Sequence, residues 1–224
     1  MWKEILDNTQ AVLFDLDGTV IDSMWIWKNI DIEYFKRCRI DMPSNYQKEI
    51  EGLSFYDTAV YTHDNYLPHI SIQKLMDDWN EMAYHHYSNI VKPKEYVREF
   101  LEYLKKRGTK LGIATSNSRM LCTATLKNNN LLDYFDSIIT GEVEGAGKPF
   151  PDVYLNSASA VGAAPEKCLV FEDVVNGIIA GNNAGMTTVA IHDDYSVYQW
   201  DEKCRIADYN IMSYKEIVDE VYNA

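Results

Sequence analysis

Residues 11–23 read AVLFDLDGTVIDS, and they combine a strand pattern with a turn pattern. It begins with an apolar run of strand formers and becomes acidic at Asp15 and Asp17, just before Gly18. An apolar run without alternating polar residues is typical of a parallel strand that is buried on both faces. An Asp-Gly pair is typical of a turn. We therefore expect a buried strand that ends in two carboxylates.

The same pattern of a short apolar run recurs further along the chain. Its repeats are KLGIAT (110–115), CLVFED (168–173) and TTVAIH (187–192). Amphipathic or Gly-terminated segments between and before these runs predict helices at Glu95–Arg107, Asp152–Val161 and Val175–Ala184. Strands that alternate with helices indicate βαβ units. The predicted fold class is α/β, with a doubly wound, Rossmann-like parallel sheet.

One region interrupts the alternation. Between Ser23 and Ile90 there is no convincing buried strand, and the apolar residues recur at helical spacing, as in Trp27, Ile30 and Tyr34. We expect a helical domain inserted after the first strand. The predicted domains are an α/β core, formed by 1–22 and 91–224, and an inserted helical domain at 23–90.

The composition limits the partners. With 34 acidic and 21 basic residues the formal net charge is -13, which repels nucleic acid and anionic membranes. The cysteines are scattered, without a CxxC pair, which favours reduced thiols in a reducing compartment; they are Cys38, Cys122, Cys168 and Cys204. The sequence shows no signal-like run and no apolar stretch of ~20 residues. We expect a cytoplasmic monomer.

Polar groups follow the predicted strands where ligands bind in open α/β sheets, at the carboxyl ends. These groups are Asp15 with Asp17, Thr115-Ser116-Asn117, Gly147-Lys148-Pro149, and Glu172-Asp173. Each alone has an ordinary explanation as a turn, a helix cap or a solvated strand end. Together they place four carboxylates, a hydroxyl cluster and a lysine around one crevice.

Charge suggests what this crevice binds. Clustered carboxylates raise one another's pKa unless a cation is present, and oxygen ligands of this kind suit Mg²⁺. Lys148 adds positive charge, and Thr115 with the amides of the following helix N-terminus supplies donors for phosphate oxygens. A carboxylate beside a metal-bound phosphate can act as a nucleophile, and a second one two residues later can act as general acid and base. A small phosphorylated metabolite is therefore the expected partner.

Four motifs in order also resemble a known family. FDLDGTVIDS (14–23), ATSNS (114–118), GKPFPDVY (147–154) and FEDVVNGIIAGNNAGM (171–186) resemble the haloacid dehalogenase superfamily of phosphatases with a helical cap, in the β-phosphoglucomutase and phosphoglycolate phosphatase group. The departure is at Asn182 and Asn183, where relatives carry small apolar residues. The helical pattern places both away from the metal.

The resemblance implies roles for the residues of these motifs. Asp15 is the expected nucleophile and Asp17 the expected general acid and base. Thr115 and Lys148 are expected to bind the transferring phosphoryl group, within a phosphate-binding set that also includes Ser116 and Asn117.

The resemblance also implies a ligand set for Mg²⁺. It consists of Asp15, Asp173 and the backbone carbonyl of Asp17, with Glu172 bound directly or through water. The implied activity is hydrolysis of a small phosphate monoester through an aspartyl-phosphate.

A sugar-phosphate mutase of the β-phosphoglucomutase type is the nearest alternative, because the loop at residues 51–54 is similar to the substrate loop of those enzymes. A second phosphate, however, requires a cationic cap residue. Where those mutases carry an arginine and a histidine, this chain has Phe55 and Trp27. Lys48 or Lys74 remains as another source of charge. A phosphatase is therefore expected.

Two further alternatives fit less well. A response-regulator receiver also uses acidic residues, a threonine and a lysine around a phosphoacceptor aspartate, but this chain is too long for a lone receiver. Asp17 also stands where an acid and base belongs. A dehalogenase has no use for such an acid.

Overall fold

The computed structural model describes residues 1–50, 55–140 and 147–223. Residues 51–54, whose sequence is similar to the substrate loop of the mutases, lie outside the described residues. The chain forms two compact units, one made of Met1–Met24 with Val91–Ala224 and the other of Trp25–Ile90.

The larger unit contains a six-stranded sheet in the order β5-β4-β1-β6-β7-β8, and every neighbouring pair is parallel. The strands are β1 (Ala11–Phe14), β4 (Lys110–Ala114), β5 (Ser137–Ile139), β6 (Cys168–Glu172), β7 (Thr187–Ile191) and β8 (Tyr209–Ile211). This order confirms the predicted α/β class and the doubly wound sheet. The four predicted strands are present, and the two that the sequence did not reveal are the edges, β5 and β8.

The strand register brings distant parts of the sequence to one edge. Phe14 pairs with Ile113 on β4 and with Phe171 on β6. The residues that come after these positions therefore leave the sheet side by side. Asp15 comes directly after β1, and Glu172 is the last residue of β6.

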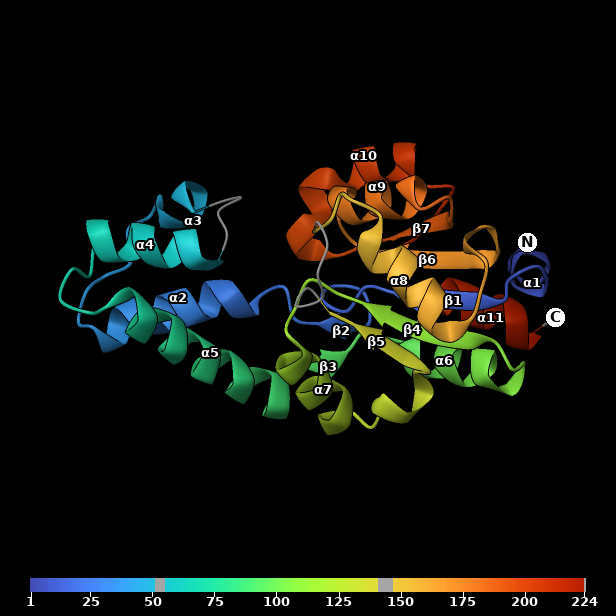
Figure 1. Cartoon of the computed structure of the whole chain (residues 1–224), viewed down its shortest axis with the longest axis horizontal. Coiled ribbons are helices and arrows are strands. Elements are labelled where there is room, and N and C mark those ends of the chain that lie inside the picture. Colours follow the sequence, from blue (N-terminus) through green and yellow to red (C-terminus); the bar gives the residue numbers. More distant parts are fainter. Residues whose placement is uncertain (51–54, 141–146, 224) are drawn as a thin grey trace. The chain divides into compact units, whose positions relative to one another are not determined.

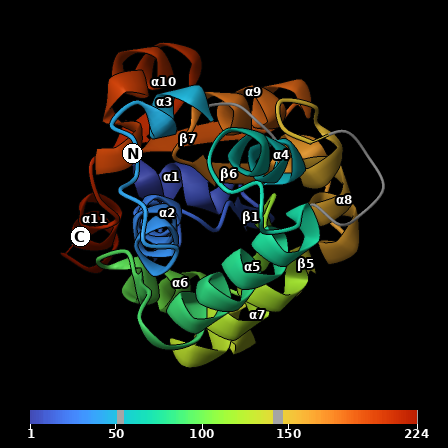
Figure 2. The ribbon, with the colours of Figure 1, turned by 90° about the vertical axis from the view of Figure 1, so that its left-hand side faces the viewer.

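Helices cover both faces of this sheet. α8, α9 and α10 lie on one face, and α6 and α11 lie on the other, where α1 packs against α11 (Figure 1). Figure 2 shows the strands between α9 and α10 on one side and α6 and α7 on the other. The helices are α1 (Trp2–Asp7), α6 (Val97–Lys106), α7 (Arg119–Asn128), α8 (Asp152–Val161), α9 (Val175–Asn183), α10 (Trp200–Ile206) and α11 (Lys215–Asn223), with short 3-10 helices η1 (Leu132–Tyr134), η2 (Pro165–Lys167) and η3 (Asp194–Gln199).

The central strand β1 is buried on both faces, which explains its continuous apolar sequence. Phe14 belongs to an aromatic cluster with Phe100, Phe171 and Tyr214, and its ring stacks on Phe171 at 5.3 Å between centroids. Leu13 belongs to a second cluster of mostly smaller residues from α8, α9 and the neighbouring strands. The carboxyl end of β1 is thus held between two packed cores.

The chain leaves and re-enters the larger unit through adjacent segments. β2 (Ile21–Asp22) pairs antiparallel with β3 (Lys92–Pro93). The N–H of Lys94 also donates to the carbonyl of Val20 at 2.9 Å. The two connections to residues 25–90 therefore form a short paired ribbon.

All the regular elements described in the smaller unit are helices. They are α2 (Ile26–Arg37), α3 (Tyr46–Glu49), α4 (Phe55–Asn65) and α5 (Ile72–Asn89). Aromatic rings fill much of the space between them. Phe35 contacts Tyr46 at 4.9 Å, and Trp79 contacts Tyr34 and Phe55 at 5.9 Å between ring centroids. Aromatic burial of this kind stabilises a unit too small for a large aliphatic core.

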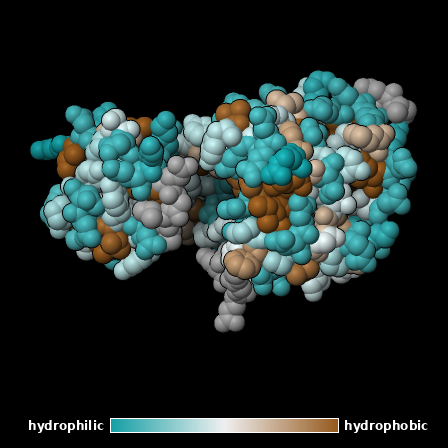
Figure 3. Space-filling model, turned by 90° about the horizontal axis from the view of Figure 1, so that it is seen from above, coloured by the Kyte–Doolittle hydropathy of each residue, from teal (hydrophilic) through white to brown (hydrophobic). Residues whose placement is uncertain are grey.

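The surface seen in Figure 3 is largely hydrophilic, and hydrophobic residues appear on it as separate small patches. Among the described residues, no helix combines the length and the apolar character needed to cross a lipid bilayer.

Asp31 on α2 is a buried carboxylate that receives a hydrogen bond from Gln47 Nε2 at 2.7 Å. Burial raises its pKa from 3.8 to about 6, and the Gln47 bond opposes this rise. The folded protein therefore binds this proton more tightly than the unfolded chain, so stability falls as the pH rises through 4 to 6. At pH 7 the ionised carboxylate destabilises the unit.

We predict that Asp31→Asn raises the free energy of unfolding at pH 7 by about 1 to 3 kcal/mol, because the amide keeps a partner for Gln47 without a charge. The gain should disappear below about pH 4, where Asp31 is protonated in both states. Urea unfolding across this pH range measures it. Asp41→Asn, at an exposed carboxylate of the same unit, is the control. An equal effect of both substitutions would contradict the prediction.

Candidate active site

Lys148 joins two carboxylates at the carboxyl end of the sheet. Its Nζ lies 2.5 Å from Asp15 Oδ1 and 2.5 Å from Glu172 Oε1, and all three side chains are at most 10% exposed. The two acids come from the neighbouring strands β1 and β6, while the lysine lies before α8. Burying two like charges so close together is unfavourable without a shared cation, and Lys148 supplies one.

Four donors hold Glu172 in place. Oε1 accepts hydrogen bonds from Lys148 and from the hydroxyl of Tyr154, at 2.8 Å for the latter. Oε2 accepts from the backbone N–H groups of Asp173 and Val174, at 3.0 and 3.3 Å. Both oxygens are therefore already used by the protein. The carboxylate acts as an anchor for Lys148.

Asp173 differs from Glu172 in how its two oxygens are used. Its Oδ1 accepts a hydrogen bond from Thr19 Oγ1 at 3.3 Å, whereas its Oδ2 is buried without a partner among the described residues. Gly18 packs against this Oδ2 atom, because a Cβ at Gly18 would lie only 2.3 Å from it. The φ of Gly18 is +79°, which also favours glycine at this position. An unpaired buried carboxylate oxygen is costly, which points to a ligand at this position.

Asp15, Glu172 and Asp173 form a compact acidic cluster in which one oxygen of each lies within 4.8 Å of the others. Burial raises the pKa of Asp15 to about 8, with Lys148 opposing and the neighbouring acids adding to the rise. Burial also raises the pKa of Asp173 well above its ordinary value; Glu172 and Asp15 contribute, and Lys203 opposes. The raised pKa values reflect negative charges held close together in a buried site, and an all-oxygen donor set of this kind fits a hard divalent cation.

Asp17 lies outside this cluster. Its Oδ1 accepts a hydrogen bond from Ser23 Oγ at 2.6 Å, and its Oδ2 accepts one from Asn117 Nδ2 at 3.0 Å. The carboxylate is thus oriented from both sides. Neither Ser23 nor this use of the Asn117 side chain was recognised in the sequence.

The segment after β4 leads into the N-terminus of helix α7. Thr115 is buried, and its Oγ1 accepts a hydrogen bond from the N–H of Asn117 at 3.0 Å, so the hydroxyl hydrogen remains available to a ligand. Ser118 caps α7 by accepting from the N–H of Leu121. Ser116 is exposed. The predicted hydroxyl cluster therefore contains one buried hydroxyl next to a helix N-terminus.

The loop around Lys148 has support that the sequence did not show. Tyr154 places its ring 5.1 Å from Lys148 Nζ and its hydroxyl on Glu172. Asn183, which the helical pattern placed away from the metal, donates from its side chain to the carbonyl of Pro149 at 3.1 Å. Asn182 donates similarly to the carbonyl of Ile206. These amides fasten α9 to neighbouring segments.

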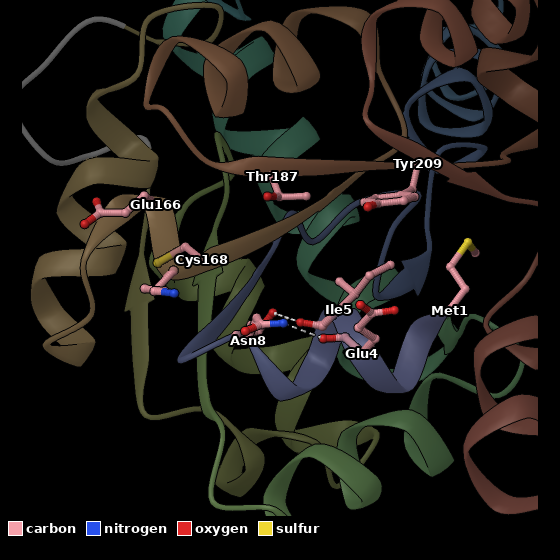
Figure 4. Close-up of a pocket in the computed structure, with 10 residues that line it drawn as sticks. Met1, Glu4, Ile5, Asn8, Glu166, Cys168, Thr187 and Tyr209 are labelled. Carbon is pink, nitrogen blue, oxygen red and sulfur yellow. Dashed lines mark hydrogen bonds between the residues drawn. The ribbon is translucent and has the colours of Figure 1, made fainter. Parts of the chain in front are cut away.

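A pocket of about 390 Å³ lies at the other ends of the strands, near the first residues of β6 and β7 (Figure 4). Its polar groups are partly used by the chain itself, because Asn8 donates to the carbonyls of Glu4 and Ile5 at the end of α1. Ligands in open α/β sheets bind at the carboxyl ends of the strands. The candidate active site is therefore the acidic cluster.

A known protein family matches most of this chain. The model of the haloacid dehalogenase-like hydrolases matches residues 12–191. The pyrophosphatase PpaX of Bacillus cereus is 29% identical over 181 residues, which cover 81% of this chain and 82% of that protein.

Two solved structures have a similar fold. A putative β-phosphoglucomutase from Thermotoga maritima has a TM-score of 0.80 and 23% identity, with 96% of this chain and 100% of that chain covered. A predicted phosphoglycolate phosphatase from Haemophilus somnus has a TM-score of 0.78 and 18% identity, with 96% and 98% covered.

Gly177 on α9 allows Glu172 to lie against the helix, since a Cβ there would be 1.8 Å from Oε1 and 2.4 Å from Oε2. We predict that Gly177→Ala displaces the Glu172 carboxylate, breaks its bonds to Lys148 and Tyr154, and lowers the free energy of unfolding by about 1 to 3 kcal/mol. Denaturant unfolding and a crystal structure of the variant measure this. Asn176→Ala, at the exposed neighbouring position, should leave both unchanged. An undisturbed Glu172 in Gly177→Ala would contradict the prediction.

Proposed function

Because this chain belongs to the haloacid dehalogenase-like hydrolases, we propose that it is a Mg²⁺-dependent phosphatase that hydrolyses a small phosphate monoester through an aspartyl-phosphate on Asp15. The observation that supports this most strongly is the geometry around Lys148. Its ammonium bridges Asp15 and Glu172, and the nearby Asp173 carboxylate keeps one oxygen, Oδ2, without a partner among the described residues. A relative named a pyrophosphatase adds support.

The proposed reaction has two steps. In the first, an Asp15 oxygen attacks phosphorus, the bond from phosphorus to the ester oxygen breaks, and Asp17 gives its proton to the leaving alkoxide. In the second, Asp17 takes a proton from water as that water attacks phosphorus, which releases inorganic phosphate and regenerates the Asp15 carboxylate. Ser23 and Asn117 hold Asp17 in one orientation for both transfers.

Asp15, Asp173 and the backbone carbonyl of Asp17 would hold the Mg²⁺. We place Glu172 next to these ligands with contact through water, because four protein donors already bond its oxygens. When bound, Mg²⁺ supplies positive charge that lowers the repulsion between Asp15 and the phosphate dianion.

The remaining residues of the site are proposed to bind the phosphoryl group. Lys148 contributes charge, and Thr115 contributes its free hydroxyl hydrogen. The N-terminus of α7 and the N–H of Ser116 are proposed to favour an anion, whereas the N–H of Asn117 already donates to Thr115 Oγ1. Lys148 also lowers the pKa of Asp15 against the effect of burial, which favours the ionised, nucleophilic form.

A phosphatase is favoured over a mutase by the packing of the helical unit. Trp27 and Phe55, which replace the polar residues of the mutases, contact each other at 5.7 Å between ring centroids. Lys74 is engaged in an ion pair with Asp78 at 2.5 Å. Neither observation provides a second phosphate anchor. We propose that residues 23–90 act as the cap of a core formed by 1–22 and 91–224.

The proposed setting is the cytoplasm, with the enzyme acting as a monomer on a small phosphorylated metabolite. The four cysteines are free, as expected in a reducing compartment. The net charge of -13 argues against nucleic acid and membranes as partners.

We predict that Asp15→Asn folds normally and loses well over ~100-fold in turnover, because an amide cannot form the acyl phosphate. Asp17→Asn should slow both formation and hydrolysis of the phosphoenzyme. Rapid-quench labelling with a phosphorylated substrate measures the two steps separately. Asp133→Asn, at an exposed carboxylate of the same unit, is the charge-matched control. Near-normal turnover by Asp15→Asn, purified alongside the control, would overturn the mechanism.

We also predict that phosphate release exceeds isomerisation. A panel of phosphorylated sugars, nucleotides and small acids should include at least one ester with sustained, multiple-turnover release of phosphate. In a second assay, β-glucose 1-phosphate is mixed with a catalytic amount of the 1,6-bisphosphate, and glucose 6-phosphate is monitored. Isomerisation much faster than phosphate release would favour a mutase, and a single stoichiometric burst would favour a phosphorylated switch.

A further inference from the structure

Lys203 on α10 is a fully buried lysine that the proposed reaction does not use. Its ammonium has three N–H groups, and three oxygens receive them: the carbonyl of Asp173 at 2.7 Å, Ser196 Oγ at 2.9 Å and the carbonyl of Ile191 at 3.3 Å. The ring of Trp200 lies 5.2 Å from its Nζ. A buried lysine with all its donors used is a built feature of the structure.

The three acceptors belong to different parts of the same sheet edge. Asp173 comes directly after β6, Ile191 ends β7, and Ser196 lies in η3. All three are neutral oxygens, two carbonyls and one hydroxyl. The ammonium therefore bonds three separate segments of the chain. None of these three acceptors is an anion, so these bonds do not neutralise its positive charge.

The carbonyl of Asp173 is the most strongly held of these groups. It accepts hydrogen bonds from Lys203 and also from Ser196 Oγ, each at 2.7 Å. On the other side of the residue, the N–H of Asp173 donates to Glu172. Both peptide groups of Asp173 are fixed, which sets the direction of its Cα–Cβ bond, and Thr19 bonds the carboxylate itself.

We propose that Lys203 is a positioning residue of the metal site: its buried ammonium fixes the Asp173 carbonyl and so holds the Asp173 carboxylate in place for Mg²⁺. This inference rests on the proposed function, because it assigns Lys203 to the metal site of that reaction. Its positive charge also partly offsets the negative charge of Asp173. Outer residues of this kind commonly change metal affinity about 10- to 100-fold when removed.

The test compares two substitutions on one helix. Lys203→Met removes the charge and the three donors but keeps a long side chain, and Ser196 can still donate to the Asp173 carbonyl. Arg205→Met removes an equal charge from an exposed position on α10, where Arg205 pairs only with Glu202, at 3.5 Å, among its described ion-pair partners. The dissociation constant of Mg²⁺, by titration calorimetry, and the unfolding midpoint without metal are measured for both.

We expect Lys203→Met to remain folded and to bind Mg²⁺ about 10-fold more weakly than wild type, whereas Arg205→Met binds it normally. Ser196→Ala removes one donor to the same carbonyl by a smaller change. We expect it to weaken Mg²⁺ binding by about 3-fold, and it carries the test if Lys203→Met does not fold.

The outcomes separate the two proposals. Failure of the wild-type protein to bind Mg²⁺ overturns the proposed function. If wild type binds Mg²⁺ and Ser196→Ala binds it equally well, as does Lys203→Met if that variant folds, then only the proposed role of Lys203 is overturned. A merely structural lysine would lower the unfolding midpoint without changing the Mg²⁺ dissociation constant of the folded protein.

Discussion

The structure depends on one constraint, which is that two carboxylates are buried within reach of a single ammonium. Asp15 and Glu172 can share an interior only because Lys148 lies between them. The parallel pairing of β1 with β6 brings the two acids together, and Gly177 leaves room for one of them. Tyr154 and Asn183 support the loop that carries Lys148 and so help to hold its ammonium between the two carboxylates.

Two lysines approach the acidic cluster, and they act on different groups. Lys148 bonds directly to carboxylate oxygens and so controls their charge. Lys203 bonds to the backbone carbonyl of Asp173 and so controls the direction of a side chain. Between them Asp173 keeps one oxygen without a protein partner among the described residues. The two lysines thus have separate roles, one in neutralising charge and one, as proposed, in orienting Asp173, and the remaining Asp173 oxygen is where we propose that Mg²⁺ binds.

Local sequence pattern was sufficient to predict the centre of the sheet and the charged groups at its carboxyl edge. β1, β4, β6 and β7 are largely buried on both faces and therefore read as apolar runs, whereas β5 and β8 are three-residue edge strands that expose part of their surface. The charged groups were found because the register of a parallel sheet brings its strand ends together.

The supporting contacts could not be predicted in this way. Asn183 and Lys203 were missed because each bonds a backbone carbonyl that no local pattern connects to it, and Ser23, only six residues from Asp17, was missed because its contact depends on how the turn folds. Lys203 is 30 residues from Asp173 in the sequence, and Asn183 is 34 residues from Pro149. No spacing rule identifies a side chain that bonds a distant backbone carbonyl.

The pairing of β2 with β3 has a consequence for how such a chain can evolve. Both crossings into residues 25–90 pass through one ribbon, so the ends of the insertion are already adjacent in the α/β unit. Lengthening, shortening or exchanging the insertion changes a loop whose closure entropy depends only weakly on its length. The strand register that aligns Asp15 with Glu172 is untouched by such an exchange. Under the proposed role of this insertion as a cap, a new insertion could therefore change the substrate while Asp15, Lys148 and Glu172 keep their arrangement.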